Sequence, residues 1–259
     1  MNNIEQEGLI PALRQKQILE IIEKKKTVSV KELSSALFIN EATIRRDLNV
    51  LAKSGAVTRT YGGAVLNEGA DGEIPFSVRA TTFTEEKRQI GKTAAEFIRN
   101  GDTVFLDSSS TAAHIVPYLA EKTGLKIVTN GVKILALLAA RGDFDVFSTG
   151  GKLRENSLSL AGSAAEAGLK RFHFDSAFFS CRGTDVTHGF TDSSPEEAEI
   201  RKILLTNSKK CYALCDSTKF GAVAFYSIAP VTAVTAIIAD SAPEQTVNAL
   251  KSMGVPVYY

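Results

Sequence analysis

The stretch Thr43-Ile44-Arg45-Arg46-Asp47-Leu48-Asn49-Val50-Leu51 decides how the N-terminal part of the chain folds. Ile44, Leu48 and Leu51 recur at the spacing of one helix face, which predicts a helix over residues 41–53 with that face buried. The side chains left on or beside the exposed face are Thr43, Arg45, Arg46 and Asn49. Short polar and guanidinium side chains in the first turns of an exposed helix suit the major groove of DNA, where arginine binds guanine.

Two further helices are predicted upstream of this stretch. Apolar residues from Ala12 to Lys25 form one face of a helix, which ends in a run of lysines. The sequence Ser29-Val30-Lys31-Glu32 is a capping box, so a short helix is expected to start at Val30 and to turn Leu33, Ala36 and Leu37 inward. Asn40 then caps the helix over 41–53, and Gly55 closes it.

A wing follows the third helix. Residues 56–65 indicate two short strands around a turn, in which Arg59 and Tyr61 are placed to lie along a phosphate backbone. Two adjacent arginines on a helix usually mark only a solvated surface. Here the order of helix, capped helix, arginine-bearing helix and Gly-Gly wing favours DNA binding. The candidate DNA-binding residues are Ser29, Asn40, Thr43, Arg45, Arg46, Asn49, Arg59 and Tyr61.

The distribution of charge agrees with this interpretation. The first 66 residues hold ten Lys and Arg against seven Asp and Glu, although the whole chain has a net charge of only +1. A basic module on a nearly neutral body is a weak indication of contact with phosphates.

These segments resemble the DNA-binding domain of DeoR-type repressors. The resemblance rests on residues 14–19, 28–33, 43–51 and 59–64, above all on the Thr-Ile-Arg-Arg-Asp-Leu run followed by Gly-Gly-Ala. Asn40 stands where the family usually carries serine, and asparagine caps a helix equally well. We therefore expect a winged helix-turn-helix over residues 1–66 that binds double-stranded operator DNA.

The remainder of the chain is expected to form a second domain. Residues 67–83 are predicted as a linker and entry segment because their first part is rich in glycine and acidic residues. Over residues 84–259, helical stretches separate most of the strand-like runs, which are Thr103–Leu106, Lys126–Thr129, Asp145–Ser148, Ser176–Phe179, Cys211–Leu214 and Ala236–Ala239. Such alternation predicts an α/β fold class with a doubly wound, mainly parallel sheet.

Polar loops follow several of these strands, where ligands bind in sheets of this kind. Each loop taken alone fits ordinary caps and turns, and Glu196 and Lys219 also fit a helix cap and a surface lysine. Three similar loops after successive strands favour a shared anionic ligand. The candidate effector-binding residues are Asp107, Ser108, Ser109, Ser110, Thr111, Thr129, Asn130, Gly150, Gly151, Arg182, Glu196 and Lys219.

This half resembles the DeoR-type effector domain, a relative of sugar-phosphate isomerase and CoA-transferase folds. The matching residues include Leu106-Asp107, Val128-Thr129-Asn130, Phe174–Phe178 and Asp216–Gly221. The resemblance implies that a phosphorylated sugar or similar intermediate relieves repression. The chain differs from the family pattern in two loops. Residues 108–111 stand where the family tends to have Gly-Thr-Thr, and Ser-Cys-Arg-Gly at 180–183 replaces a Gly-Ala-rich loop.

Other classes of protein receive little support. The three cysteines form no disulfide framework, the three histidines have no ligand spacing, and no nucleotide-binding motif is present, so neither metal nor cofactor is expected. No apolar run suits a membrane helix, and we expect a cytoplasmic homodimer or higher homo-oligomer. The alternative is a sugar-phosphate isomerase with an appended DNA-binding domain, with Glu196, Asp175 or Asp107 as its base.

Overall fold

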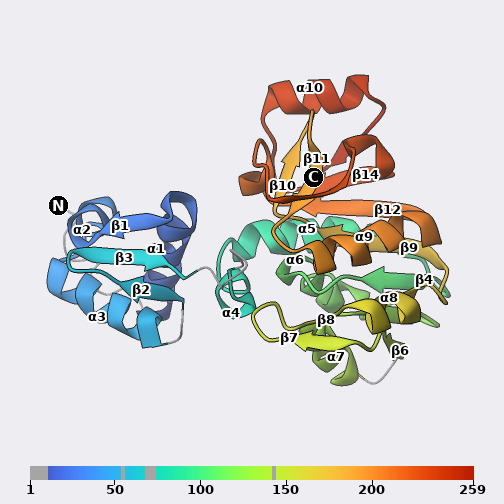
Figure 1. Ribbon diagram of the computed structural model, residues 1–259, viewed down its shortest axis with the longest axis horizontal. Coiled ribbons are helices and arrows are strands. Elements are labelled where there is room, and N and C mark those ends of the chain that lie inside the picture. Colours follow the sequence, from blue (N-terminus) through green and yellow to red (C-terminus); the bar gives the residue numbers. More distant parts are fainter. Residues whose placement is uncertain (1–10, 54–55, 68–73, 142–143) are drawn as a thin grey trace. The chain divides into compact units, whose positions relative to one another are not determined.

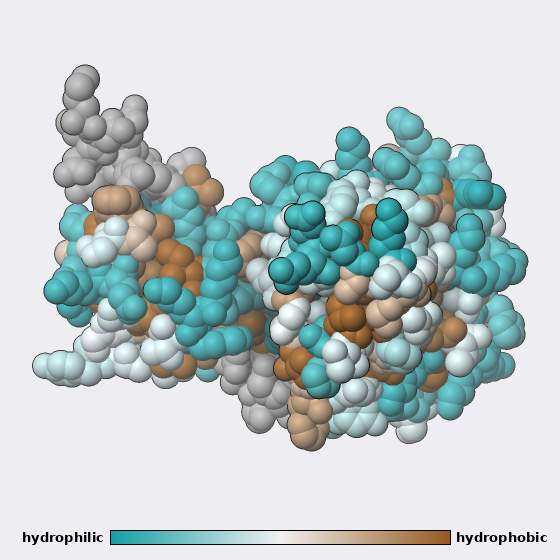
Figure 2. All heavy atoms as spheres, turned by 90° about the horizontal axis from the view of Figure 1, so that it is seen from above, coloured by the Kyte–Doolittle hydropathy of each residue, from teal (hydrophilic) through white to brown (hydrophobic). Residues whose placement is uncertain are grey.

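The computed structural model describes residues 11–53, 56–67, 74–141 and 144–259. The chain divides between Phe83 and Thr84 into two units (Figure 1). The buried apolar cluster of the first unit contains no described residue of the second. Gly55 and the glycine-rich residues 68–73, which we expected to close a helix and to form a linker, lie outside the described residues. Hydrophilic side chains cover much of the face of each unit drawn in Figure 2.

The first unit is the expected winged helix-turn-helix. Its elements are α1 (Pro11–Lys25), β1 (Thr27–Ser29), α2 (Val30–Leu37), α3 (Glu41–Lys53), β2 (Val57–Arg59), β3 (Gly63–Leu66) and α4 (Phe76–Arg79). The three strands form an antiparallel sheet in the order β1-β3-β2. The predicted capping box is present, since Ser29 Oγ accepts from Glu32 N while the Glu32 carboxylate accepts from Ser29 N.

One expectation for α2 is wrong, because Ala36 is exposed. Val30 and Leu33 are buried and Leu37 is partly buried, so these three set the inward face of an eight-residue helix. Ala36 is rotated about 100° from Leu37 and falls outside that face. The helix ends at Phe38, which adopts the left-handed conformation with φ 55°.

The segment after the wing packs on the first unit. Ile74 and Val78 are buried in the same core as Ile18, Ile44 and Leu48. The carboxylate of Glu20 on α1 also accepts a hydrogen bond from Phe83 N at 3.2 Å. The second half of the predicted linker and entry segment, 67–83, therefore contributes to the core of the N-terminal unit.

The second unit is built on a seven-stranded parallel sheet, as expected for a doubly wound α/β fold. Its strands are β4 (Thr103–Leu106), β5 (Lys126–Thr129), β6 (Asp145–Ser148), β9 (Phe174–Ser180), β12 (Ser208–Cys215), β14 (Ala236–Ala239) and β15 (Val257–Tyr258). The order is β15-β14-β12-β9-β4-β5-β6. The chain thus extends the sheet from β4 to β6 and returns to the other side of β4 at β9, which makes the ends of β4 and β9 the topological switch point.

Helices cover both faces of this sheet. They are α5 (Thr84–Glu96), α6 (Ser110–Ala113), α7 (Val132–Ala139), α8 (Ser163–Leu169), α9 (Pro195–Asn207) and α10 (Glu244–Ser252). Alternate residues of one strand enter separate cores, as Phe179 packs in one and Phe178 in the other. This alternation explains the nearly continuous apolar runs from which the strands were predicted.

Two small antiparallel sheets were not predicted. One is the hairpin of β7 (Lys152–Arg154) and β8 (Ser159–Ala161), and the other has the order β10-β11-β13, from Gly183–Asp185, Gly189–Asp192 and Tyr226–Ala229. Gly183 is needed for the second sheet, because a Cβ there would lie 2.2 Å from the carbonyl oxygen of Ala222. No described helix combines the length and apolar character that a membrane span requires.

Candidate functional site

The exposed face of α3 carries the residues expected to read DNA. Arg45, Arg46 and Asn49 are exposed, whereas Thr43 is partly buried. Asn40 Oδ1 accepts from Thr43 N at 2.8 Å, which is the predicted N-cap. Arg45 is also held by an exposed ion pair, with Nη2 3.1 Å from the Oε2 of Glu41 one turn earlier. The cap and the ion pair order the first turns of the helix.

A charged residue of α3, Asp47, faces inward instead. Its side chain is 2% exposed, and the carboxylate accepts hydrogen bonds from Arg14 Nη2 and Gln15 Nε2, each at 3.1 Å. The helical pattern carried the signal, because position 47 lies three residues after Ile44 and four before Leu51. The apolar spacing alone does not predict the pair, because Asp47 is a charged member of that face.

The wing presents Tyr61 to solvent at the turn between β2 and β3. Thr60 N donates to Gly63 O at 3.1 Å to close this turn, and Tyr61 is fully exposed. A Cβ at Gly63 would lie 2.0 Å from Val28 O, so glycine is required where β3 pairs with β1. Arg59 is partly buried, and its Nη1 has no hydrogen-bond partner within the described part of the chain.

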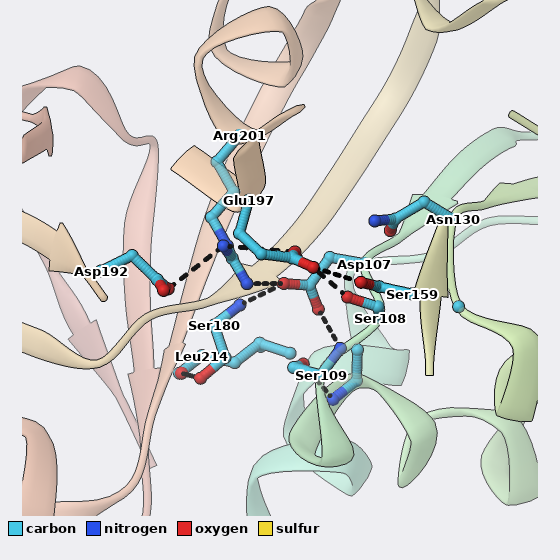
Figure 3. Close-up of polar contacts among 12 residues, drawn as sticks. Asp107, Ser108, Ser109, Asn130, Ser159, Ser180, Asp192, Glu197, Arg201 and Leu214 are labelled. Atoms are coloured by element: carbon cyan, nitrogen blue, oxygen red, sulfur yellow. Dashed lines mark hydrogen bonds and ion pairs between the residues drawn. The ribbon is translucent and has the colours of Figure 1, made fainter. Parts of the chain in front are cut away.

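In the second unit, Asp107 joins the ends of the two strands at the switch point (Figure 3). It follows β4, and its carboxylate accepts from Ser109 N and, across the sheet, from Ser180 N, both at 3.0 Å. Arg201 Nη2 of α9 approaches Oδ2 at 3.2 Å. Burial raises the pKa of Asp107 above its ordinary value, although the Arg201 guanidinium opposes that shift.

Arg201 binds a second strand end as well. Its Nη1 lies 3.1 Å from Asp192 Oδ2 and 3.6 Å from Glu197 Oε2, contacts that are ion pairs without hydrogen-bond geometry. Burial lowers the pKa of Arg201, but the carboxylates of Asp192 and Asp107 outweigh it and hold the pKa above its ordinary value. The guanidinium is therefore charged inside the fold.

Glu197 connects this arrangement to the β7–β8 hairpin. Ser159 Oγ of β8 donates to Oε1, Arg154 Nη1 of β7 lies 3.2 Å from the same atom, and Ser108 Oγ donates to Oε2 at 3.4 Å. Arg154 Nε also pairs with Glu196 Oε2 at 3.1 Å. We call the five buried or half-buried charged residues the Asp107 cluster, which consists of Asp107, Arg154, Asp192, Glu197 and Arg201. Three carboxylates face two guanidiniums.

Other candidate effector residues lie around the cluster or apart from it. Asn130 Nδ2 donates to Leu160 O at 3.3 Å, while its Oδ1 is buried without a partner among the residues described (Figure 3). Thr129 Oγ1 accepts from Gly131 N. Ser109 caps the one-turn helix α6, in which Ser110 and Thr111 are buried. The structure thus brings together Asp107, Ser108 and Ser109, with Glu196 added through Arg154.

Three of the expected loops form no hydrogen bond or ion pair with the Asp107 cluster within the described ranges. Gly150 and Gly151 are exposed and have positive φ angles of 68° and 110°. Lys219 Nζ instead lies 3.7 Å from Asp216 Oδ2. Arg182 is half-buried, and its Nη2 has no hydrogen-bond partner in the described residues.

The sequence does not predict several residues of this site. The capping pattern predicts Glu197 only as a helix cap, and no local pattern places Arg154, Asp192, Ser159 or Arg201 at this site. Glu197 and Arg201 are one turn apart on the buried side of α9, which is a detectable signal. Their partners come from distant segments that no local pattern joins.

Comparison with known proteins agrees with both halves of this description. The model of the DeoR-like helix-turn-helix domain matches residues 14–70, and that of the DeoR C terminal sensor domain matches residues 82–241. The HTH-type transcriptional regulator YulB of Bacillus subtilis is 37% identical over 96% of each chain.

Two further proteins are similar to this chain. The glycerol-3-phosphate regulon repressor of Escherichia coli K12 is 30% identical over 90% of this chain and 92% of its own length. Ribose 5-phosphate isomerase A of Methanocaldococcus jannaschii is similar in structure over 53% of this chain and 54% of its own, with 16% identity and a TM-score of 0.40.

Proposed function

Because the chain belongs to the DeoR family of transcriptional regulators, we propose that it represses a carbohydrate-catabolism operon until a phosphorylated metabolite binds. The observation that carries the DNA-binding half is the division of α3. Ile44, Asp47 and Leu48 are buried, while Arg45, Arg46 and Asn49 remain exposed on the opposite side. A helix anchored in this way suits the major groove, with the wing of Arg59 and Tyr61 beside a phosphate backbone.

The metabolite is proposed to bind at the switch point of the large unit. A relative is named for the glycerol-3-phosphate regulon. The loop of Ser108 to Thr111 places four buried hydroxyl side chains at the end of β4, of which Ser108 bonds to Glu197 and Ser109 caps α6. The Asp107 cluster carries one more negative than positive charge, so a phosphate is repelled by it and belongs on the hydroxyl loop, with Arg182 and Lys219 as candidate counter-charges.

The sugar hydroxyls would then point toward acceptors. The buried Asn130 Oδ1 lacks a hydrogen-bond partner in the described chain, which costs about 1–3 kcal/mol until a donor reaches it. A hydroxyl of the metabolite is a suitable donor. This arrangement predicts that both the phosphate and at least one hydroxyl are needed for tight binding.

We propose binding without turnover. A general base needs an accessible lone pair beside the substrate carbon. The Asp107 carboxylate is engaged by Ser180 N and Arg201. The Asp175 carboxylate pairs with Lys209 and accepts from Thr103 N, and Glu196 pairs with Arg154. These contacts favour a sensor over the isomerase alternative.

Assembly and location complete the proposal. A winged helix reads one half-site, so a homodimer or higher homo-oligomer would bind a palindromic operator through paired recognition helices. Such a regulator works where the chromosome lies, and we place it in the cytoplasm.

The test starts from a thermal-shift screen of phosphorylated sugars, each paired with its unphosphorylated form. A ligand raises stability by RT ln(1 + [L]/Kd), so binders are recognised by a concentration-dependent rise in Tm. A DNA site is first selected by the protein from a random library. The expected result is that a phosphorylated sugar which binds the protein also lowers its affinity for this DNA. Turnover of that binder by the purified protein would support the isomerase alternative instead.

A further inference from the structure

Two of the three cysteines, Cys181 and Cys215, lie side by side at the ends of adjacent strands. Ser180 of β9 is in register with Leu214 of β12, so the residues that follow them are neighbours. Both thiols are buried in the same core, on one side of the sheet. Thr184 Oγ1 of β10 lies 3.2 Å from each sulfur, so one hydroxyl contacts both thiols.

The spacing of neighbouring strands is compatible with a disulfide between these two positions. Neighbouring strands lie about 4.8 Å apart, within the Cα separation of about 4.4–6.8 Å that a disulfide spans. Cys211 lies four residues before Cys215 on β12, about 13 Å along the strand at 3.3 Å per residue, so it is out of reach of Cys181. We propose that Cys181 and Cys215 are a site of reversible oxidation, which a hydroperoxide converts to an intrachain disulfide while Cys211 stays reduced.

The reaction balances with hydrogen peroxide as oxidant. The Cys181 thiolate attacks one peroxide oxygen, the O–O bond breaks, and the leaving hydroxide takes up a proton to become water. The Cys215 thiol then attacks the sulfur of the resulting sulfenic acid, the S–S bond forms, and a second water leaves with the thiol proton. Two thiols are oxidised and one peroxide is reduced to two waters.

Cys181 is the thiol suited to the first attack. The neighbouring Cys215 thiol, helped by Thr184, lowers the pKa of Cys181 although burial opposes this. Burial raises the pKa of Cys211 to about 12, which keeps that thiol protonated and unreactive. Cys181 is also 5% exposed while Cys215 is fully buried.

The disulfide would act on the sensor site through its neighbours. Ser180, directly before Cys181, donates its amide to Asp107, and Asp216, directly after Cys215, pairs with Lys219. A covalent link would replace the two thiol contacts with Thr184 and fix the ends of β9 and β12. Formation of the disulfide does not depend on the proposed function. An effect of the disulfide on DNA release does rest on the proposed function.

The test is oxidation of the full chain with hydrogen peroxide, followed by alkylation of free thiols and mass spectrometry. We expect loss of two of the three thiols, a mass lower by about 2 Da, and full recovery with dithiothreitol. Trypsin cuts after Arg171, Arg182, Lys210 and Lys219, so the link should join peptide 172–182 to peptide 211–219.

Matched variants assign the bond. Peptide 211–219 contains both Cys211 and Cys215, so C211S must form the same link as wild type, whereas C215S must not. T184V keeps both thiols and should slow the reaction, because it removes the hydroxyl that contacts them. The wild-type protein alone can overturn the proposal. The contradicting results are sulfinic acid at Cys181 with no disulfide, a disulfide between two chains, or a disulfide that involves Cys211.

Discussion

Arg14 of α1 and Asp47 of α3 form a buried ion pair, with two contacts that tie the first helix to the recognition helix. Arg14 Nε lies 2.5 Å and Nη2 3.1 Å from the two carboxylate oxygens. Exposed Arg45 and Arg46 precede Asp47 directly, so the pair fixes the rotation of the helix surface that reads DNA. Removing one partner of a buried pair leaves the other charge uncompensated.

We therefore predict that Asp47→Ala lowers the opening free energy of α1 and α3 amides by about 3–5 kcal/mol. Native-state hydrogen exchange of the full chain measures this loss. The control is Lys16→Ala, which removes a partly exposed pair at 3.9 Å from Glu20 and should cost under about 1 kcal/mol. Equal effects of the two substitutions would show that the buried pair does not hold α3.

The recognition helix gives the second prediction. Arg45→Ala or Arg46→Ala should weaken operator binding by about 1–3 kcal/mol and relax sequence preference, because base contacts are lost. Fluorescence anisotropy with operator and scrambled DNA separates the two effects. Arg88→Ala, an equally exposed arginine of the large unit, should leave both unchanged. If both α3 variants bind as wild type does, another surface reads the DNA.

The wing should behave differently from the recognition helix. Arg59→Ala should weaken specific and non-specific DNA about equally and reduce the salt dependence of log K by about one unit, as loss of one phosphate contact requires. Titrations at several salt concentrations measure the slope. A loss confined to one DNA sequence would mean that Arg59 contacts a base.

Stability of the large unit should depend on pH through His114. Burial lowers the pKa of His114 below its ordinary value of 6.5, although Nδ1–H of the ring donates a hydrogen bond to Ser110 O. The folded state therefore binds a proton less readily than the unfolded state. The contribution of the neutral His114 ring to the free energy of unfolding is fully present above pH 6.5, and it is lost as pH falls through the lowered pKa. His114→Gln should reduce the dependence of the free energy of unfolding on pH, measured by urea unfolding. If the variant keeps the wild-type pH dependence, another group causes it.

The sequence predicted the elements whose pattern is local. Helix α3 follows from the spacing of Ile44, Leu48 and Leu51. Six of the seven strands of the large sheet follow from short strand-like runs, whereas β15 has only two residues and was not predicted. The strands β7, β8, β10 and β11 have three or four residues each, too few for a period to show. They exist because the surrounding fold pairs them.

The site divides in the same way. Asp107 and Ser108 could be selected because they directly follow a recognisable strand. Arg201 could not be assigned its role, since its partners Asp107 and Asp192 are 94 and nine positions away and meet it only in the folded unit. A buried charge network of this kind is a property of tertiary structure.

The coupling between the two units tests the central claim most directly. The measurement is the Kd of operator DNA with and without the phosphorylated binder, and the Kd of that binder with and without DNA. Linkage requires the same factor in both directions, and couplings of this kind run to about 1–3 kcal/mol. Thr111→Ala and Lys219→Ala should keep ligand-free DNA binding and reduce the factor; Ser109→Ala is less suitable because it removes the cap of α6. Release of DNA by the neutral sugar alone, or a binder that changes neither Kd, would contradict the account.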